Sequence, residues 1–161
     1  MCTDCSISYE NGNITVEGEA TEKAIVEAAL KNGDNRDKLY EQMQRINDIP
    51  FDSERKMMTT IHKIGNKYRV ITKGAPDVLI KKCSMYSKRN MSYSITQQEI
   101  RYLENQNEKM AKRALRVIAI AYKDLDVLPS KIDESIENNL CFLRTYRNGR
   151  PTKERCKRSG C

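Results

Sequence analysis

The sequence predicts an α+β domain in which a mainly antiparallel sheet is flanked by helices. Two strand-like runs, Met58 to Lys63 and Tyr68 to Thr72, are separated by Ile64-Gly65-Asn66-Lys67. Glycine and asparagine tolerate the positive φ that a tight hairpin turn needs, so the two runs are expected to pair as antiparallel strands. Segments with apolar residues at helical spacing precede and follow this hairpin, which indicates helices packed against the sheet.

The first helix is expected to open at Gly18-Glu19-Ala20-Thr21-Glu22 and to end at Asn32-Gly33. Thr21 is a candidate N-cap. Glu22 would then lie in the first turn, where the helix dipole favours a carboxylate and the side chain is free to point at a ligand. From the residues alone, an ordinary first-turn carboxylate is the simpler interpretation. Before this helix, Ile14 to Val16 is a candidate strand.

A second helix is predicted from Arg36 to Arg45. Phe51 follows it and directly precedes the charged turn Asp52-Ser53-Glu54-Arg55-Lys56. An isolated phenylalanine is more often a core residue. Next to a strongly charged turn, however, its ring can offer a face at the surface, where a purine could stack.

A lysine and a glycine, Lys73 and Gly74, stand where the second strand of the hairpin gives way to a helix beginning at Pro76. Glycine lets the backbone come close to a ligand, helix N-terminal amides attract anions, and lysine adds a point charge. This combination favours an anionic ligand.

The basic segment Lys81 to Ser94 is predicted to be loop-like. After it, Thr96 and Glu99 have the spacing of a capping box, which predicts the start of a long helix through Arg113.

The apolar run from Arg116 to Tyr122 is bounded by charges and is predicted to be a buried strand. Arg116 stands at the start of this strand. Its simplest interpretation is an arginine at the junction between a helix and a strand. A surface connection with a short helix is expected from Leu125 to Asn139, and a further strand begins at Leu140-Cys141-Phe142.

The positive charge is concentrated at the C-terminus. Residues 144–161 hold seven Lys or Arg and one Glu, so they carry +6 of the net charge of +7. The body of the chain is therefore nearly neutral. A basic nucleic-acid-binding module that uses this tail is the alternative function, although residues 1–143 show no interleaving of aromatic and basic residues of the kind found in RRM domains.

The six cysteines suggest a zinc site only weakly. Cys2 and Cys5 have knuckle spacing, but Cys156 and Cys161 are separated by four intervening residues and no histidine flanks them. The single histidine, His62, alternates with its neighbours in a predicted strand and is expected at the surface. No metal site is therefore assigned, and the cysteines are expected to be reduced thiols.

The length of 161 residues fits one domain with a real core. No apolar run approaches the roughly 20 residues that a membrane helix needs. The start of the chain lacks the basic segment and apolar core of a signal peptide. The sequence therefore predicts a soluble chain.

Four blocks of sequence, taken together, form a specific signature of a protein family. They are Gly18-Glu19-Ala20-Thr21-Glu22, Phe51-Asp52-Ser53-Glu54-Arg55-Lys56-Met57-Met58, Lys73-Gly74-Ala75-Pro76-Asp77 and Ala114-Leu115-Arg116-Val117-Ile118-Ala119-Ile120-Ala121-Tyr122. In this order they resemble the nucleotide-binding domain of P-type cation-transporting ATPases, nearest the calcium-pump branch. One block alone would be a weak signal.

The resemblance implies that the domain binds ATP together with Mg²⁺. It places the adenine near Phe51 and Glu22, and it places Lys73 and Gly74 beside the base and ribose. Ser53 is assigned no role, because some relatives have arginine at the matching position.

The resemblance also implies two further contacts. Lys56 is a second lysine on the adenine or phosphate side, and Arg116 points toward the phosphates. No catalytic residue is assigned, because the acceptor aspartate of the family lies in an Asp-Lys-Thr-Gly-Thr motif that this sequence lacks. The chain is therefore expected to hold ATP without hydrolysing it. Its expected partners are the phosphorylation and actuator domains of a membrane pump, on the cytoplasmic side.

Residues 1–143 are assigned to the nucleotide-binding domain and residues 144–161 to a basic tail with little order, since the tail is nearly free of aliphatic residues. The family continues this strand with a hinge that ends Gly-Met-x-Asp-Pro-Pro-Arg. One choice of codons from Leu143 onward, translated one base later, gives Leu-Glu-Leu-Ile-Gly-Met-Val-Asp-Pro-Pro-Arg. A single-base shift in the coding sequence near Leu143 is therefore a hypothesis for the origin of the tail, and a genuine basic tail is the alternative.

Overall fold

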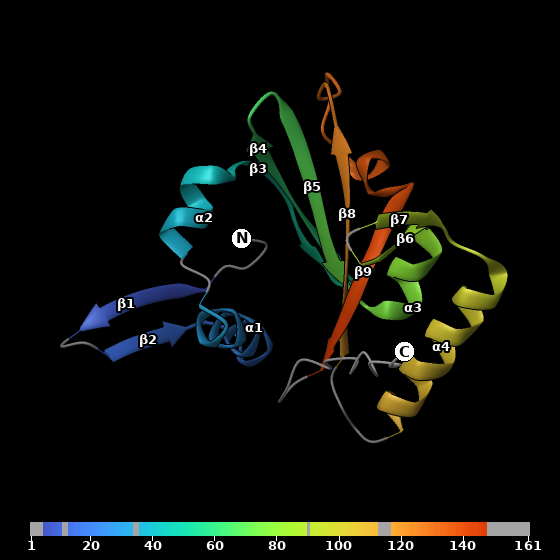
Figure 1. Ribbon diagram of the computed structural model, residues 1–161, viewed down its shortest axis with the longest axis horizontal. Coiled ribbons are helices and arrows are strands. Elements are labelled where there is room, and N and C mark those ends of the chain that lie inside the picture. The colour runs from blue at the N-terminus through green and yellow to red at the C-terminus, as the bar shows by residue number, and fades with distance from the viewer. Residues whose placement is uncertain (1–4, 11–12, 34–35, 90, 113–116, 148–161) are drawn as a thin grey trace, which may run out of the picture.

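The computed structural model describes residues 5–10, 13–33, 36–89, 91–112 and 117–147 (Figure 1). The strands are β1 Ser6–Glu10, β2 Asn13–Glu17, β3 Gln44–Asp52, β4 Met57–Ile64, β5 Lys67–Gly74, β6 Cys83–Lys88, β7 Met91–Ser94, β8 Val117–Leu125 and β9 Leu140–Arg147. The α-helices are α1 Ala20–Lys31, α2 Arg36–Gln42, α3 Pro76–Leu79 and α4 Gln97–Ala111, and the short 3₁₀ helices are η1 Ile80–Lys82 and η2 Glu134–Glu137.

A seven-stranded sheet in the order β3-β4-β5-β8-β9-β6-β7 forms the centre of the domain. All neighbouring strands in it are antiparallel except β6 and β9, which are parallel. Strands β1 and β2 form a separate antiparallel hairpin. Figure 1 shows α3 and α4 on one side of the large sheet and α1, α2 and the β1–β2 hairpin on the other. The predicted α+β fold with a mainly antiparallel sheet is confirmed.

The β4–β5 hairpin forms as its turn chemistry predicts. Met57 pairs with Gly74 at one end, and Ile64 pairs with Lys67 at the turn, where Gly65 has φ +55°. Glycine adopts this left-handed conformation without the steric penalty that a Cβ brings. Both faces of β4 are buried over most of its length, because the two sides of the sheet are both covered.

The larger core cluster lies between the sheet and the α3–α4 side. Its buried members are Met57, Leu79, Ile80, Cys83, Ala119, Ala121, Leu140 and Phe142. A smaller cluster joins Ile61 and Val70 to Ile136 of η2. The small side chains of Ala119 and Ala121 explain how α3 packs closely on β8, which confirms the buried strand predicted there.

Two predicted helix boundaries need correction. Helix α1 begins one residue before Thr21, and its N-cap is Glu19, which makes no side-chain capping bond. Helix α2 ends at Gln42 rather than Arg45, because Gln44 already pairs with Lys63 in the sheet. Strand pairing thus overrides the helical propensity of this segment.

The capping box of α4 is confirmed. The Thr96 hydroxyl accepts a hydrogen bond from the Glu99 amide at 3.2 Å, and the Glu99 carboxylate accepts one from the Thr96 amide at 2.9 Å. The helix ends at Ala111, and the predicted end at Arg113 lies outside the described residues.

The loop predicted from Lys81 to Ser94 is wrong. This segment contains the hairpin β6–β7, in which Tyr86 pairs with Tyr93 at the edge of the sheet. All four residues of β7 are exposed, and Met91 and Tyr93 alternate with serines over only four residues, which is too short a pattern to mark the strand clearly in the sequence. Short edge strands of this kind discourage pairing with other chains.

The surface position predicted for His62 is also wrong. His62 is 1% exposed, and its ring nitrogens lie 3.1 Å from the Met43 carbonyl oxygen and 3.0 Å from the Thr60 hydroxyl. The alternation in β4 does place His62 on the face opposite Ile61, but the α2–β3 junction covers that face.

Strand β9 runs to Arg147 and so contains the first four residues of the predicted tail. Arg144 pairs with Ile120 and Thr145 with Ala119, so the tail begins inside the sheet. The first residues assigned to the tail therefore continue β9, and residues 148–161 lie outside the described residues. No helix among the described residues combines the length and apolar character needed to cross a membrane.

Candidate functional site

The β3–β4 turn meets the end of β5 at one edge of the sheet. The Lys56 carbonyl oxygen accepts a hydrogen bond from the Ala75 amide at 3.0 Å, directly after β5 ends at Gly74. A Cβ at Gly74 would lie 2.5 Å from this same oxygen and 2.6 Å from Met57 Cγ. Gly74 therefore allows the turn to close on β5, and two predicted site residues are brought together.

Lys73 and Glu22 form an ion pair on one face of the sheet. The side chain of Thr72 points to the other face. The Lys73 side chain is 8% exposed and the Glu22 side chain 13%, and Lys73 Nζ contacts Glu22 Oε1. A largely buried ammonium is costly unless it is paired, so this contact fixes α1 against β5. Cys5 Sγ lies 3.9 Å from the other oxygen of Glu22.

Phe51 is 64% exposed near the end of β3. Large aromatic rings bury 150–250 Å² when they are covered, so an exposed one offers a binding surface. The prediction that the Phe51 ring lies at the surface is confirmed. Its contact with adenine stays a prediction.

Lys56 adopts a left-handed backbone conformation with φ 55°. A non-glycine residue in this region costs on the order of 1 kcal/mol or more and needs support from its surroundings. Here the Lys56 amide donates to the Asp52 carbonyl oxygen at 2.7 Å, while the Asp52 carboxylate accepts from the amides of Glu54 and Arg55. The turn is thus closed by its own backbone and by an aspartate side chain.

Arg116 lies outside the described residues, so its predicted phosphate contact stays a prediction. Strand β8 begins at the next residue, Val117, and Ala119 pairs with Gly74.

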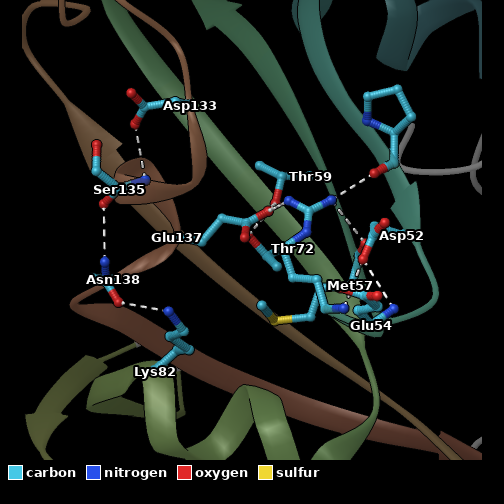
Figure 2. Close-up of polar contacts among 12 residues, drawn as sticks. Asp52, Glu54, Met57, Thr59, Thr72, Lys82, Asp133, Ser135, Glu137 and Asn138 are labelled. Atoms are coloured by element: carbon cyan, nitrogen blue, oxygen red, sulfur yellow. Dashed lines mark hydrogen bonds and ion pairs between the residues drawn. The ribbon is translucent and has the colours of Figure 1, made fainter.

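Sequence reasoning missed a buried polar cluster under the same edge, which Figure 2 shows. Arg55 Nη1 donates to Glu137 Oε1 at 3.0 Å, and the Thr59 hydroxyl donates to the same oxygen at 2.6 Å. The Thr59 and Thr72 hydroxyls lie 2.9 Å apart. The only sequence signal is the pair of threonines facing each other in the hairpin, because Glu137 falls in a segment that is otherwise typical of a surface connection.

No group of three or more potential metal ligands occurs among the described residues. Cys5, Cys83 and Cys141 are buried. The other members of the weak zinc pattern, Cys2, Cys156 and Cys161, lie outside the described residues.

The geometry is thus that of an α+β domain whose central hairpin brings lysines, a carboxylate and an exposed ring to one edge. A family model described as the P-type ATPase cytoplasmic domain N matches residues 1–144. The chain belongs to this N-domain family, which confirms the resemblance seen in the four sequence blocks.

Individual relatives agree with this assignment. A calcium-transporting ATPase of Listeria monocytogenes is 33% identical over 143 residues, which cover 89% of this chain and 16% of the relative. Calcium-transporting ATPase 1 of Bacillus cereus is 34% identical over the same shares. A cation-transporting ATPase of Synechocystis is 33% identical over 145 residues, again 89% of this chain and 16% of the relative. This chain therefore spans about one sixth of the length of these relatives.

Proposed function

We propose that this domain binds ATP with Mg²⁺ and presents it to the phosphorylation domain of a larger, cation-transporting pump. Calcium is the proposed cation, because relatives that match most of this chain are named calcium-transporting ATPases. The domain would lie on the cytoplasmic side of the membrane, next to the phosphorylation and actuator domains of the same protein. The membership in the N-domain family supports all of these steps.

The observation that carries the proposal is the ion pair between Lys73 and Glu22 beside the turn that bears Phe51 and Lys56. The residues fit an adenine nucleotide in their chemistry. The exposed ring of Phe51 suits stacking with a purine, and the amines of Lys56 and Lys73 suit an electron-rich or anionic group.

Each residue has a separate proposed role. Phe51 stacks on the adenine, and Glu22 orients the Lys73 amine beside the base and ribose. Gly74 keeps the backbone close at this point, while Lys56 supplies a second positive charge. Arg116 is proposed to contact the phosphates.

ATP supplies the phosphoryl group, and the proposed role of this chain is to bind and orient the nucleotide. We assign no catalytic residue to it, because phosphoryl transfer needs an acceptor and the Asp-Lys-Thr-Gly-Thr acceptor motif of the family does not occur in this sequence. Purified protein should release no phosphate from ATP, whereas release that disappears with Lys73→Ala would overturn this assignment.

The test is an ATP titration followed by NMR shifts or calorimetry. We expect a dissociation constant on the order of 0.1–1 mM. Phe51→Ala should weaken binding by at least about 1 kcal/mol because the stacking face is lost. Lys73→Ala should cost a comparable amount. Tyr102→Ala is a matched control, since Tyr102 is a similarly exposed ring that belongs to α4.

Shifts confined to the edge formed by Phe51, Lys56 and Gly74 would support the proposed site. Equal binding by the parent protein, Phe51→Ala and Lys73→Ala would show that the site is misplaced. The alternative of a nucleic-acid-binding module receives no support from the described residues or from the relatives.

A further inference from the structure

Arg55 belongs to the β3–β4 turn, yet its side chain is directed into the domain and is 10% exposed. Its Nη2 donates to the carbonyl oxygen of Pro50 at 2.6 Å and to that of Met57 at 3.2 Å. Pro50 directly precedes Phe51, and Met57 directly follows Lys56. One guanidinium therefore holds both ends of the segment that carries the proposed stacking ring and the second lysine.

The end of β3 needs such support, because its pairing with β4 is irregular here. Ile49 pairs with Thr59 and Asp52 with Met57, so Pro50 and Phe51 lie opposite a single residue of β4. A bulge of this kind redirects a side chain and takes backbone groups out of the ladder. Proline in addition has no N–H to donate. The bonds to the guanidinium replace part of what the ladder loses.

The guanidinium is itself held by a carboxylate from a distant segment. Glu137 is fully buried, and its Oε1 accepts from Arg55 Nη1 at 3.0 Å and from the Thr59 hydroxyl at 2.6 Å. The hydroxyl of Thr72 lies 2.9 Å from that of Thr59. Thr72 directly precedes Lys73, so the cluster connects the turn to both strands of the central hairpin (Figure 2).

The position of Glu137 is in turn fixed by the ends of η2. The Asp133 carboxylate accepts a hydrogen bond from the Ser135 amide at 3.0 Å at the start of this helix. At its end, Lys82 Nζ donates to the Asn138 side-chain oxygen at 3.1 Å (Figure 2). The Glu137 carboxylate therefore belongs to a segment that hydrogen bonds hold at both ends.

The cluster is poorly suited to a role in stability alone. Arg55 Nε and Glu137 Oε2 are buried without a hydrogen-bond partner among the described residues. The desolvation of a buried ion pair offsets much of its attraction, and apolar replacement of such a pair is often neutral. The contacts instead define a geometry around Phe51 and Lys56.

We propose that Arg55, held by Glu137, is a positioning residue of the nucleotide site. It fixes the Phe51–Lys56 segment in the conformation that presents the ring and the amine to the ligand. Its own side chain is buried and does not touch the nucleotide. This inference rests on the ATP binding proposed above.

The test replaces the pair by apolar residues of similar size, in the double variant Arg55→Met/Glu137→Leu. Calorimetric titration with ATP should show binding weakened about five- to tenfold, in line with the loss of charged hydrogen bonds that set the geometry. The urea midpoint should stay close to that of the parent protein. Arg69→Met/Asp124→Leu is the matched control, because that arginine–carboxylate pair, at 2.7 Å, joins β5 to β8 near the opposite end of β5.

A purely structural role would not produce coupling to Phe51. In the Phe51→Ala background, the additional loss of affinity from the double variant should shrink to about twofold. Without nucleotide, the amides of Lys56 and Ala75 should exchange at least about tenfold faster in the double variant, because their bonds close the turn.

Unchanged ATP affinity of the double variant, or a full loss that persists in the Phe51→Ala background, overturns the positioning role. If the double variant does not fold, Arg55→Lys serves instead, since one amine cannot span both carbonyls and Glu137. The Arg55→Lys variant should remain folded and bind ATP more weakly. Unchanged ATP affinity of this variant again overturns the inference. Failure of the parent protein to bind ATP is a separate result, which overturns the proposed function and this role with it.

Discussion

The Lys56 carbonyl oxygen occupies the space that a side chain at Gly74 would need. A Cβ there would lie 2.5 Å from this oxygen, and the oxygen also accepts the hydrogen bond from the Ala75 amide. The packing of the turn therefore requires glycine at position 74, whether or not this residue contacts a ligand. It lets the β3–β4 turn close on the end of β5, which brings Lys56 to Lys73.

Gly74→Ala should lower both stability and ATP affinity. The added methyl group forces the backbone of Lys56 or Met57 to move, and overpacking of this kind typically costs about 1–3 kcal/mol. Urea unfolding measures the first effect and calorimetric titration the second.

Gly33→Ala separates the two effects. Gly33 follows α1 with φ +85° and has no atoms within 4 Å of a Cβ, so alanine there strains the backbone alone. This variant should lose stability and keep its ATP affinity. A Gly74→Ala variant that behaves in the same way would show that the turn does not depend on this close approach.

Removing either partner of the Lys73–Glu22 pair should destabilise the domain. Both side chains are largely buried, and breaking such a pair costs about 3 kcal/mol because a buried charge loses its main compensation. We expect Lys73→Met and Glu22→Gln each to lower the urea midpoint.

The double variant Lys73→Met/Glu22→Gln should be more stable than the sum of the two single changes predicts, because neither charge is then left behind. Strict additivity would mean that the two groups do not interact in solution.

The sequence predicts those features that depend on neighbouring residues. The turn at Gly65 and the capping box of Thr96 and Glu99 depend on chemistry within four residues, and both form as expected. The burial of β8 is also predictable, because its apolar residues follow one another directly in the sequence.

The features that were missed depend on segments distant in sequence. His62 is buried because the α2–β3 junction covers it, and Glu137 is buried because Arg55 and Thr59 meet it under the sheet. Nothing within either segment indicates such a partner. The direction of Arg55 was missed similarly, since a charged turn is usually solvated on all sides.

Stability should fall on acidification because of His62. Burial lowers the pKa of His62 below its ordinary value of 6.5, the Arg45 charge acts in the same direction, and the hydrogen bond to the Met43 carbonyl opposes them. The unfolded chain therefore binds a proton at a higher pH than the folded one. The free energy of unfolding should decrease as the pH falls through 6.5 and should level off once the folded protein is protonated as well.

Urea unfolding between pH 7.5 and 5 measures this effect, and His62→Gln is the control. The variant should lose the pH dependence in this window while the dependence on carboxylates at lower pH remains. A parent protein with the same slope as His62→Gln would show that His62 titrates normally in the folded state.

The structure adds a stability test to the frameshift hypothesis for the tail. In β9, Thr145 pairs with Ala119, which is completely buried, yet a threonine hydroxyl and methyl bury less apolar surface than a larger aliphatic side chain. With the choice of codons given above, the continuation in the next frame places leucine at this position. Thr145→Leu should therefore raise the free energy of unfolding, by about 1 kcal/mol.

The gene itself gives the direct answer. If its DNA encodes Gly-Met-x-Asp-Pro-Pro-Arg one base out of frame after Leu143, the tail arose from the shift, and the family match that ends at residue 144 has its explanation. A gene without that hinge in the next frame, together with a destabilised Thr145→Leu variant, would establish residues 144–161 as a genuine basic tail. The two measurements are independent, because the first concerns only the nucleotide sequence and the second only the packing of β9 on β8.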